Sequence, residues 1–170
     1  MEIKAAFDAL SEMPRALESR IAGLSERELR FKPGTDTFSV LENVCHLRDI
    51  EVDGYALRLQ LLLTQEYPLL PDINGSELAE ARRYNSQAFQ PALQAFVDAR
   101  HGCLGVLANL TPADLAREGH FENVGDVTLG RLLELWVAHD RDHIKDLDDL
   151  LAVLRDPARN KPKPSLSLTT

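Results

Sequence analysis

The sequence predicts an all-α protein built as a four-helix bundle, and three observations support this fold class. Four long stretches of the 170-residue chain place apolar residues at helical spacing. The segments between these stretches carry proline, glycine or helix-capping residues, which are typical of helix ends. No stretch shows the convincing alternation of apolar and polar residues that indicates a half-buried strand. Four helices with short connections favour a bundle, whose interior can hold metal sites.

The first helix is expected from about Ile3 to Gly23, and Pro14 inside this range predicts either a kink or a later start. Its inner face is expected to consist of apolar residues at helical spacing, namely Phe7, Leu10, Leu17, Ile21 and Leu24. The second helix is expected from about Val40 to Gln65. It follows Ser39, and Ser39 with Glu42 forms the capping-box pattern, in which each side chain binds the other residue's backbone N–H.

The third helix is expected from about Ser76 to Asn109, with a bend or interruption at Pro91 because proline lacks the N–H that a helix interior needs. Thr111 followed by Pro112 predicts a short extra helical turn. The fourth helix is expected from about Leu129 to Arg155.

We therefore expect one domain over residues 1–155, because a chain of this length can bury a full core without a second domain. Residues 156–170 contain three prolines among lysine, arginine, serine and threonine residues. Such a composition predicts a flexible C-terminal tail.

The composition excludes several classes of protein. Apolar residues make up 44% of the chain and charged residues 27%, as in an ordinary globular domain. No apolar run reaches the roughly 18 residues of a membrane span, and charged residues interrupt the N-terminal stretch where a signal peptide would need an apolar core. A cytoplasmic location is expected, with no membrane partner. The net charge of −8 argues against nucleic-acid binding. Cys45 and Cys103 are expected to be small buried residues.

Two histidines, His139 and His143, lie four residues apart in the last predicted helix. Positions i and i+4 share one face of a helix, so the two imidazoles can offer nitrogens to a single ion. The same face carries an apolar stripe of Leu129, Leu132, Leu133, Trp136, Leu147, Leu150 and Leu154. Both rings are therefore expected to point inward, where a polar group needs a partner. A metal ion is one such partner, although a single hydrogen bond to each ring would also serve.

A metal site needs a third ligand, and His46 is the best candidate. It shares a polar stripe with Glu42, Asp49 and Asp53 on a helix whose apolar residues are Val40, Val44, Leu47, Ile50, Leu57 and Leu61. Either that stripe faces water, or it faces a polar cavity in which His46 supplies the third nitrogen. Spacing alone does not choose between the two. His101 and His120 lie in polar surroundings and are expected to be solvated.

Two segments resemble the DinB-like, YfiT-like metal-binding superfamily. Residues 38–51 (FSVLENVCHLRDIE) are similar to the family signature, which consists of an aromatic residue followed by Ser, Glu, His-Leu, Asp and Glu. Residues 125–129 and 136–144 (WVAHDRDHI) resemble the closing segment of the family. The resemblance covers nearly all of residues 1–155. It implies a four-helix bundle that binds a divalent metal through His46, His139 and His143. Phe38 stands where the family commonly has Trp, and Asp146 lies where it often has a polar group.

Three imidazoles leave open positions on a metal ion, an arrangement typical of catalytic sites. A water molecule held there can have its pKa lowered to about 7, which favours hydrolysis, whereas a small thiol could be held as a thiolate. The resemblance implies both hydrolases and S-transferases that use low-molecular-weight thiols. A third hypothesis is a non-catalytic, stress-response module that binds a metal or small molecule.

Asp49 and Asp140 are the candidates for orienting a ligand or handling a proton, although each could instead make an ordinary ion pair or backbone hydrogen bond. Three imidazoles suit Zn, Ni, Fe and Cu almost equally, so these ligands do not identify the divalent metal, for which Zn, Ni or Fe is expected. A small-molecule substrate is expected, and the resemblance also implies a homodimer.

Overall fold

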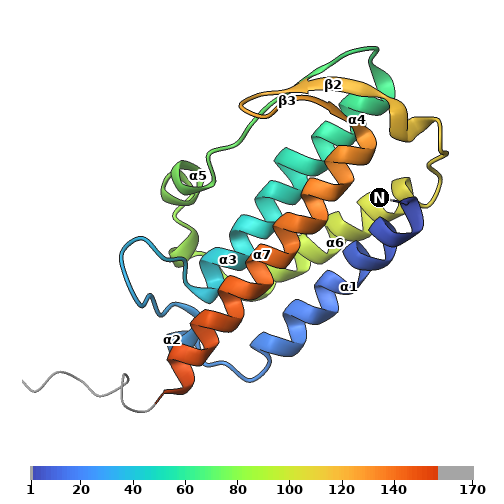
Figure 1. Ribbon diagram of the computed structural model, residues 1–170. Coiled ribbons are helices and arrows are strands. Elements are labelled where there is room, and N and C mark those ends of the chain that lie inside the picture. The colour runs from blue at the N-terminus through green and yellow to red at the C-terminus, as the bar shows by residue number, and fades with distance from the viewer. Residues whose placement is uncertain (1, 157–170) are drawn as a thin grey trace, which may run out of the picture.

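The computed structural model describes residues 2–156 and confirms the four-helix bundle (Figure 1). The predicted tail lies outside the described residues, apart from Asp156. The four long segments of the bundle are α1 (Ile3–Ile21), the continuous run of α3 (Val40–Asp49), η1 (Ile50–Ala56) and α4 (Leu57–Thr64), then α6 (Phe89–Leu107) and α7 (Leu129–Arg155). The shorter elements are α2 (Glu26–Leu29), β1 (Leu69–Leu70), α5 (Gly75–Ala81), η2 (Tyr84–Ser86), η3 (Asp114–Ala116), β2 (Glu118–Phe121) and β3 (Gly125–Thr128).

Local sequence explains where the long helices begin. Ser39 and Glu42 form the predicted capping box at the start of α3, with each side chain bonded to the other residue's backbone N–H. Thr128 caps α7 by accepting a hydrogen bond from the backbone N–H of Arg131. Pro14 lies inside α1, which continues past it to Ile21. The fourth helix has the bounds that the sequence predicts.

A π-helical segment, η1, interrupts the second long helix directly after α3. Such segments insert extra residues into a helix and change the phase of its faces. Upstream of η1, the apolar residues Val44 and Leu47 are buried. Downstream, Leu57 is exposed, and Leu59 and Leu62 face the core instead. The π-helical segment thus rotates α4 by about one residue relative to a regular helix.

The predicted third helix, Ser76–Asn109, is in fact two helices, and the interruption lies before Pro91. The helix α5 ends at Ala81, and Arg83 then adopts a left-handed backbone conformation with a φ of 49°. Pro91 is the third residue of α6. In the first turn of a helix the backbone N–H has no intrahelical partner, so proline is tolerated there.

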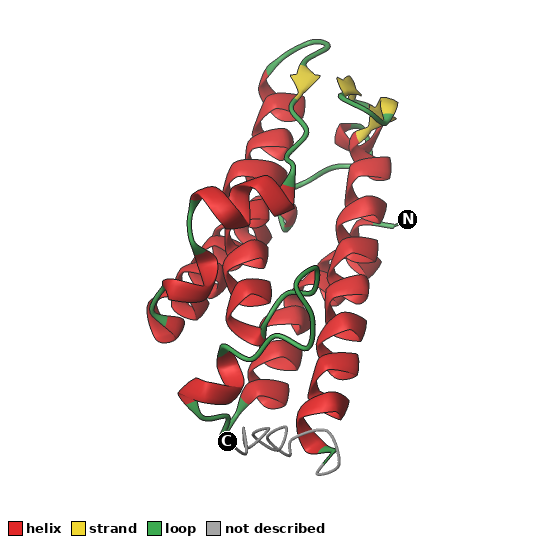
Figure 2. Ribbon diagram, turned by 90° about the vertical axis from the view of Figure 1, so that its left-hand side faces the viewer, coloured by secondary structure: helices red, strands yellow, loops and turns green. Residues whose placement is uncertain are grey.

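A small three-stranded sheet at one end of the bundle was not expected from the sequence (Figure 2). The strand β1 is parallel to β2, and β2 is antiparallel to β3. The two longer strands have only four residues each, too few for alternation to stand out against the surrounding loops. The predicted short turn after Thr111 is the 3-10 helix η3.

The core fills the space between the four long segments in two clusters, one toward each end of the bundle. All seven residues of the predicted apolar stripe on α7 are buried. The clusters also enclose Arg100 of α6, whose guanidinium binds Glu51 and Asp140 through two hydrogen bonds to each carboxylate. Within the described part of the chain, no helix combines the length and apolar character needed to cross a lipid bilayer.

Candidate metal centre

Three histidines from two long segments of the bundle converge on one point. His46 comes from α3, and His139 and His143 come from successive turns of α7. One ligand nitrogen from each ring lies within 4.8 Å of the other two. Within residues 2–156 this is the one group of three histidine, cysteine or acidic side chains close enough to hold a metal ion.

The distance between two of these nitrogens fits a shared metal ion. The Nε2 atoms of His46 and His139 are 3.3 Å apart. Two imidazole nitrogens bound to one tetrahedral ion at the usual zinc–nitrogen length of about 2.0–2.1 Å would lie roughly 3.3–3.4 Å apart. The spacing therefore needs almost no rearrangement of the rings, so the residues present fit such an ion.

Hydrogen bonds fix the orientation of the third ring, His143. The amide nitrogen of Asn43 donates to the backbone carbonyl of Ser39 at 3.0 Å, so the amide oxygen of Asn43 must face the other way. That oxygen lies 3.0 Å from Nδ1 of His143. Because a carbonyl oxygen can only accept, Nδ1 carries the proton and Nε2 of His143 keeps its lone pair for a ligand.

Aromatic and backbone contacts hold the other two rings. The Phe38 ring lies 5.5 Å from the His46 ring, between centroids, and the Tyr55 ring meets the His139 ring edge-on at 5.6 Å. A β-carbon placed on Gly75, the first residue of α5, would lie 2.4 Å from Cε1 of His46. The backbone at Gly75 thus covers the His46 ring so closely that a larger residue would displace it.

Burial keeps two of the three imidazoles neutral. It lowers the pKa of His46 to about 4, with a further contribution from the nearby His139. Burial also lowers the pKa of His143 well below its usual value, with His139 and His46 adding to the effect. Metal binding requires neutral imidazole, so both rings are in the required state at pH 7. The Nδ1 atoms of His46 and His139 are buried without hydrogen-bond partners in the described part of the chain.

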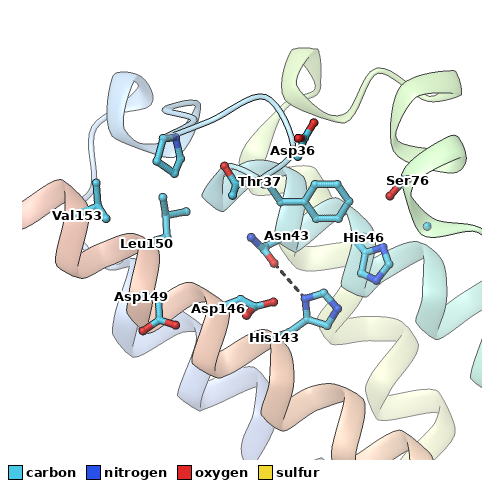
Figure 3. A pocket seen from close by; sticks show the side chains of 13 residues that line it. Asp36, Thr37, Asn43, His46, Ser76, His143, Asp146, Asp149, Leu150 and Val153 are labelled. Atoms are coloured by element: carbon cyan, nitrogen blue, oxygen red, sulfur yellow. Dashed lines mark hydrogen bonds between the residues drawn. The ribbon is translucent and has the colours of Figure 1, made fainter.

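A cavity of about 670 Å³ opens in front of two of the histidines (Figure 3). Its wall contains His46, His143 and Asn43, together with residues of the 33–38 loop, the start of α5 and the last turns of α7. His139 is not part of this wall, and its side chain is 23% exposed. Cavities of this size are typical of sites for small molecules.

The two candidate aspartates are tied to arginines rather than to the histidines. Asp140 accepts two hydrogen bonds from Arg100, and its Oδ1 lies 3.9 Å from Nδ1 of His139, beyond hydrogen-bond range. Asp49 binds Arg48 and Arg82 and accepts a hydrogen bond from the Tyr84 hydroxyl.

Burial raises the pKa of Asp49, but the hydrogen bonds from Arg48, Tyr84 and Arg82 outweigh this effect and lower it overall.

The predicted polar stripe faces the interior of the protein at His46 and Asp49, which are both buried. Asp53, which lies in η1, is substantially exposed. His101 is exposed, as expected. His120 is half exposed on β2 and binds Asp126.

Asn43 and Gly75 contribute to the site, and neither was predicted from the sequence. Asn43 lies three residues before His46, on the same side of α3, and this spacing is the one signal that could have identified it. Gly75 is far from the histidines in sequence, so only the fold shows its contact with His46.

Comparisons with known proteins agree with this architecture. The structure is similar to that of YfiT from Bacillus subtilis, described as "a probable metal-dependent hydrolase with an unusual four-helix bundle topology", with a TM-score of 0.82 over 90% of this chain and 87% of that one at 21% identity.

Two sequence relatives are each named "Putative metal-dependent hydrolase". One, from Bacillus licheniformis, is 32% identical over 79% of this chain and 77% of its own length. The other, from Oceanobacillus iheyensis, is 23% identical over 85% of this chain and 83% of its own. Residues 9–147 match the profile of the DinB superfamily. The chain therefore belongs to the DinB superfamily.

Proposed function

We propose that the protein is a metal-dependent hydrolase of a small molecule, with a divalent metal ion held by His46, His139 and His143. The observation that carries this proposal is the 3.3 Å spacing of two Nε2 atoms from different long segments, with a third imidazole beside them. The names of the sequence relatives and of YfiT support the same activity.

The donor set suits catalysis better than a purely structural role. Three protein ligands leave positions open on the ion, whereas structural zinc sites usually have four protein ligands. The cavity reaches His46 and His143, so a small molecule can approach the centre from that side. When bound, such an ion supplies a Lewis acid that polarises a carbonyl group and activates water at neutral pH.

The surrounding residues hold the ligands in place. Asn43 keeps the proton of His143 on Nδ1, which directs the lone pair of Nε2 inward. We assign Asp140 an orienting role, because its carboxylate attracts the Nδ1–H of His139 while Arg100 holds it still. Asp49, fixed by Arg48, Arg82 and Tyr84, positions the α3 segment that carries His46.

Metal analysis followed by activity assays tests this proposal. Elemental analysis of the purified protein should find one divalent metal per chain, with His143→Ala depleted and the exposed His101→Ala unchanged. Equal metal content in the wild type and in His143→Ala would remove His143 from the site.

Activity is then measured with ester and amide substrates and, separately, with small thiols plus an electrophile. Hydrolysis that depends on the metal supports the proposal. Turnover only with thiols would replace hydrolysis with S-transfer, and silence in both assays with metal bound would favour a non-catalytic binding module.

A further inference from the structure

The cavity in front of the histidines has an acidic wall. Among its lining residues are Asp36, Asp146 and Asp149, and none of the lining residues described is lysine or arginine. Asp149 already binds Lys145 of the same helix at 3.0 Å. Asp146 lies one turn after His143 on α7, and Figure 3 shows its carboxylate directed toward the space beside His143 and Asn43.

Apolar side chains line the same cavity as the carboxylates. Phe38, Leu150 and Val153 line the same cavity, and Phe38 packs against the ring of His46. His46 is only 8% exposed, and its Nδ1 has no hydrogen-bond partner in the described part of the chain. The wall thus places an acceptor for a cation, the Asp146 carboxylate, beside an apolar surface.

A second metal ion does not explain the acidic residues. Among the described residues, the three histidines are the one group whose ligand atoms lie close enough together to hold a metal ion. The acidic residues of the cavity do not form such a group. An organic cation needs only one carboxylate, since a protonated amine donates charge-assisted hydrogen bonds to it.

We infer that the cavity takes a small molecule with a protonated amine, which binds Asp146, and an apolar body, which lies against Phe38, Leu150 and Val153. This inference rests on the proposed function, because it treats the cavity before the histidines as the substrate site. In the metal-free protein the wall disfavours anionic compounds, since the Asp146 carboxylate repels them and none of the lining residues described is lysine or arginine.

Three compounds of matched shape test the charge preference: 4-phenylbutylamine, 4-phenylbutanol and 4-phenylbutyrate. Their affinities are measured by titration calorimetry on the protein as purified and again after chelator treatment, with circular dichroism to verify that the fold is retained. The amine should bind about tenfold more tightly than the alcohol, with the carboxylate weakest in the chelated protein. The preference should fall as salt is added.

Variants of α7 then locate the preference. Asp146→Asn should weaken binding of the amine about tenfold and leave binding of the alcohol unchanged. Asp142→Asn removes the same charge from an exposed position outside the cavity wall and should keep the preference. Equal affinity for the amine and the alcohol, or equal effects of the two variants, would overturn the inference.

Metal analysis of the same samples separates this inference from the proposed function. If the protein binds metal but shows no preference for the amine, the inferred substrate class is wrong and the proposed function is unaffected. An amine preference that depends on Asp146, in protein that binds no metal, supports the cavity chemistry and defeats the hydrolase.

Discussion

The amide oxygen of Asn43 on α3 lies 3.0 Å from Nδ1 of His143 on α7, and this contact links two segments that are 100 residues apart in the chain. The amide is itself oriented by the backbone carbonyl of Ser39, the residue that caps α3. A contact within the first turns of α3 therefore helps to set the tautomer of a distant ring.

Replacing Asn43 should weaken metal binding. In Asn43→Ala the Nδ1–H of His143 loses its acceptor, and the loss of such a partner typically costs about 10–100-fold in metal affinity. Competition with a coloured chelator measures the change. Asn109→Ala removes an exposed amide at the end of α6 and should leave the affinity unchanged. An Asn43→Ala protein with wild-type affinity would show that the contact does not orient His143.

A side chain at Gly75 should displace His46. The β-carbon of Gly75→Ala would meet Cε1 of His46 at 2.4 Å and Nδ1 at 2.8 Å, so either the ring or the start of α5 must move. We expect reduced metal affinity with little loss of helix content. Gly102→Ala is the matched control, because its β-carbon meets nothing within 4 Å. That helical substitution should stabilise the protein by up to about 1 kcal/mol.

The buried arginine should be essential for stability. Arg100 is 1% exposed and neutralises Glu51 and Asp140, which are also buried. In Arg100→Met both carboxylates lose their positively charged partner, and the free energy of unfolding should fall by about 3–5 kcal/mol in denaturant titrations. Arg15→Met breaks an exposed pair with Glu12 and should cost less than about 1 kcal/mol. Comparable losses in the two variants would contradict the assigned role.

The metal-free protein should lose stability as the pH falls from about 6.5 toward 4. Unfolded histidine has a pKa near 6.5, whereas His46 in the folded protein has a pKa of about 4 and that of His143 is lower still. Between these values the unfolded chain binds more protons than the folded one, so the free energy of unfolding decreases with decreasing pH.

Denaturant titrations of the chelated protein at pH 7 and pH 5 measure this pH effect. The double variant His46→Gln, His143→Gln should show a smaller loss than the wild type. His101→Gln changes an exposed ring and should keep the full loss. An unchanged loss in the double variant would mean that other groups cause the effect.

Both cysteines should resist alkylation in the folded protein. Burial raises the pKa of Cys45 to about 11 and that of Cys103 to about 12, and only the thiolate is an effective nucleophile. Mass spectrometry after iodoacetamide treatment at pH 8 should find neither residue modified, and both modified after unfolding in guanidinium chloride. Both cysteines are buried in the structure, as the sequence predicts. Rapid labelling of either thiol in the native protein would contradict this burial.

The sequence by itself determined the fold class, the bounds of α7, the capping box at Ser39 and the two histidines that face inward from α7. These features are local, because helical periodicity, caps and i, i+4 spacing depend on residues within a few turns of one another. The sequence also made His46 the best candidate for a third ligand, but spacing alone left open whether it faces water or the bundle interior, and the family resemblance favoured the interior.

Only the tertiary structure decided the features that depend on distant contacts. The π-helical segment η1 changes the face that α4 buries, and the small sheet pairs strands too short to show a pattern. The ion pairs of Arg100, the acceptor at Asn43 and the close approach of Gly75 join elements through space. No local pattern encodes such contacts. The polar groups involved could equally form hydrogen bonds to water until the helices pack together.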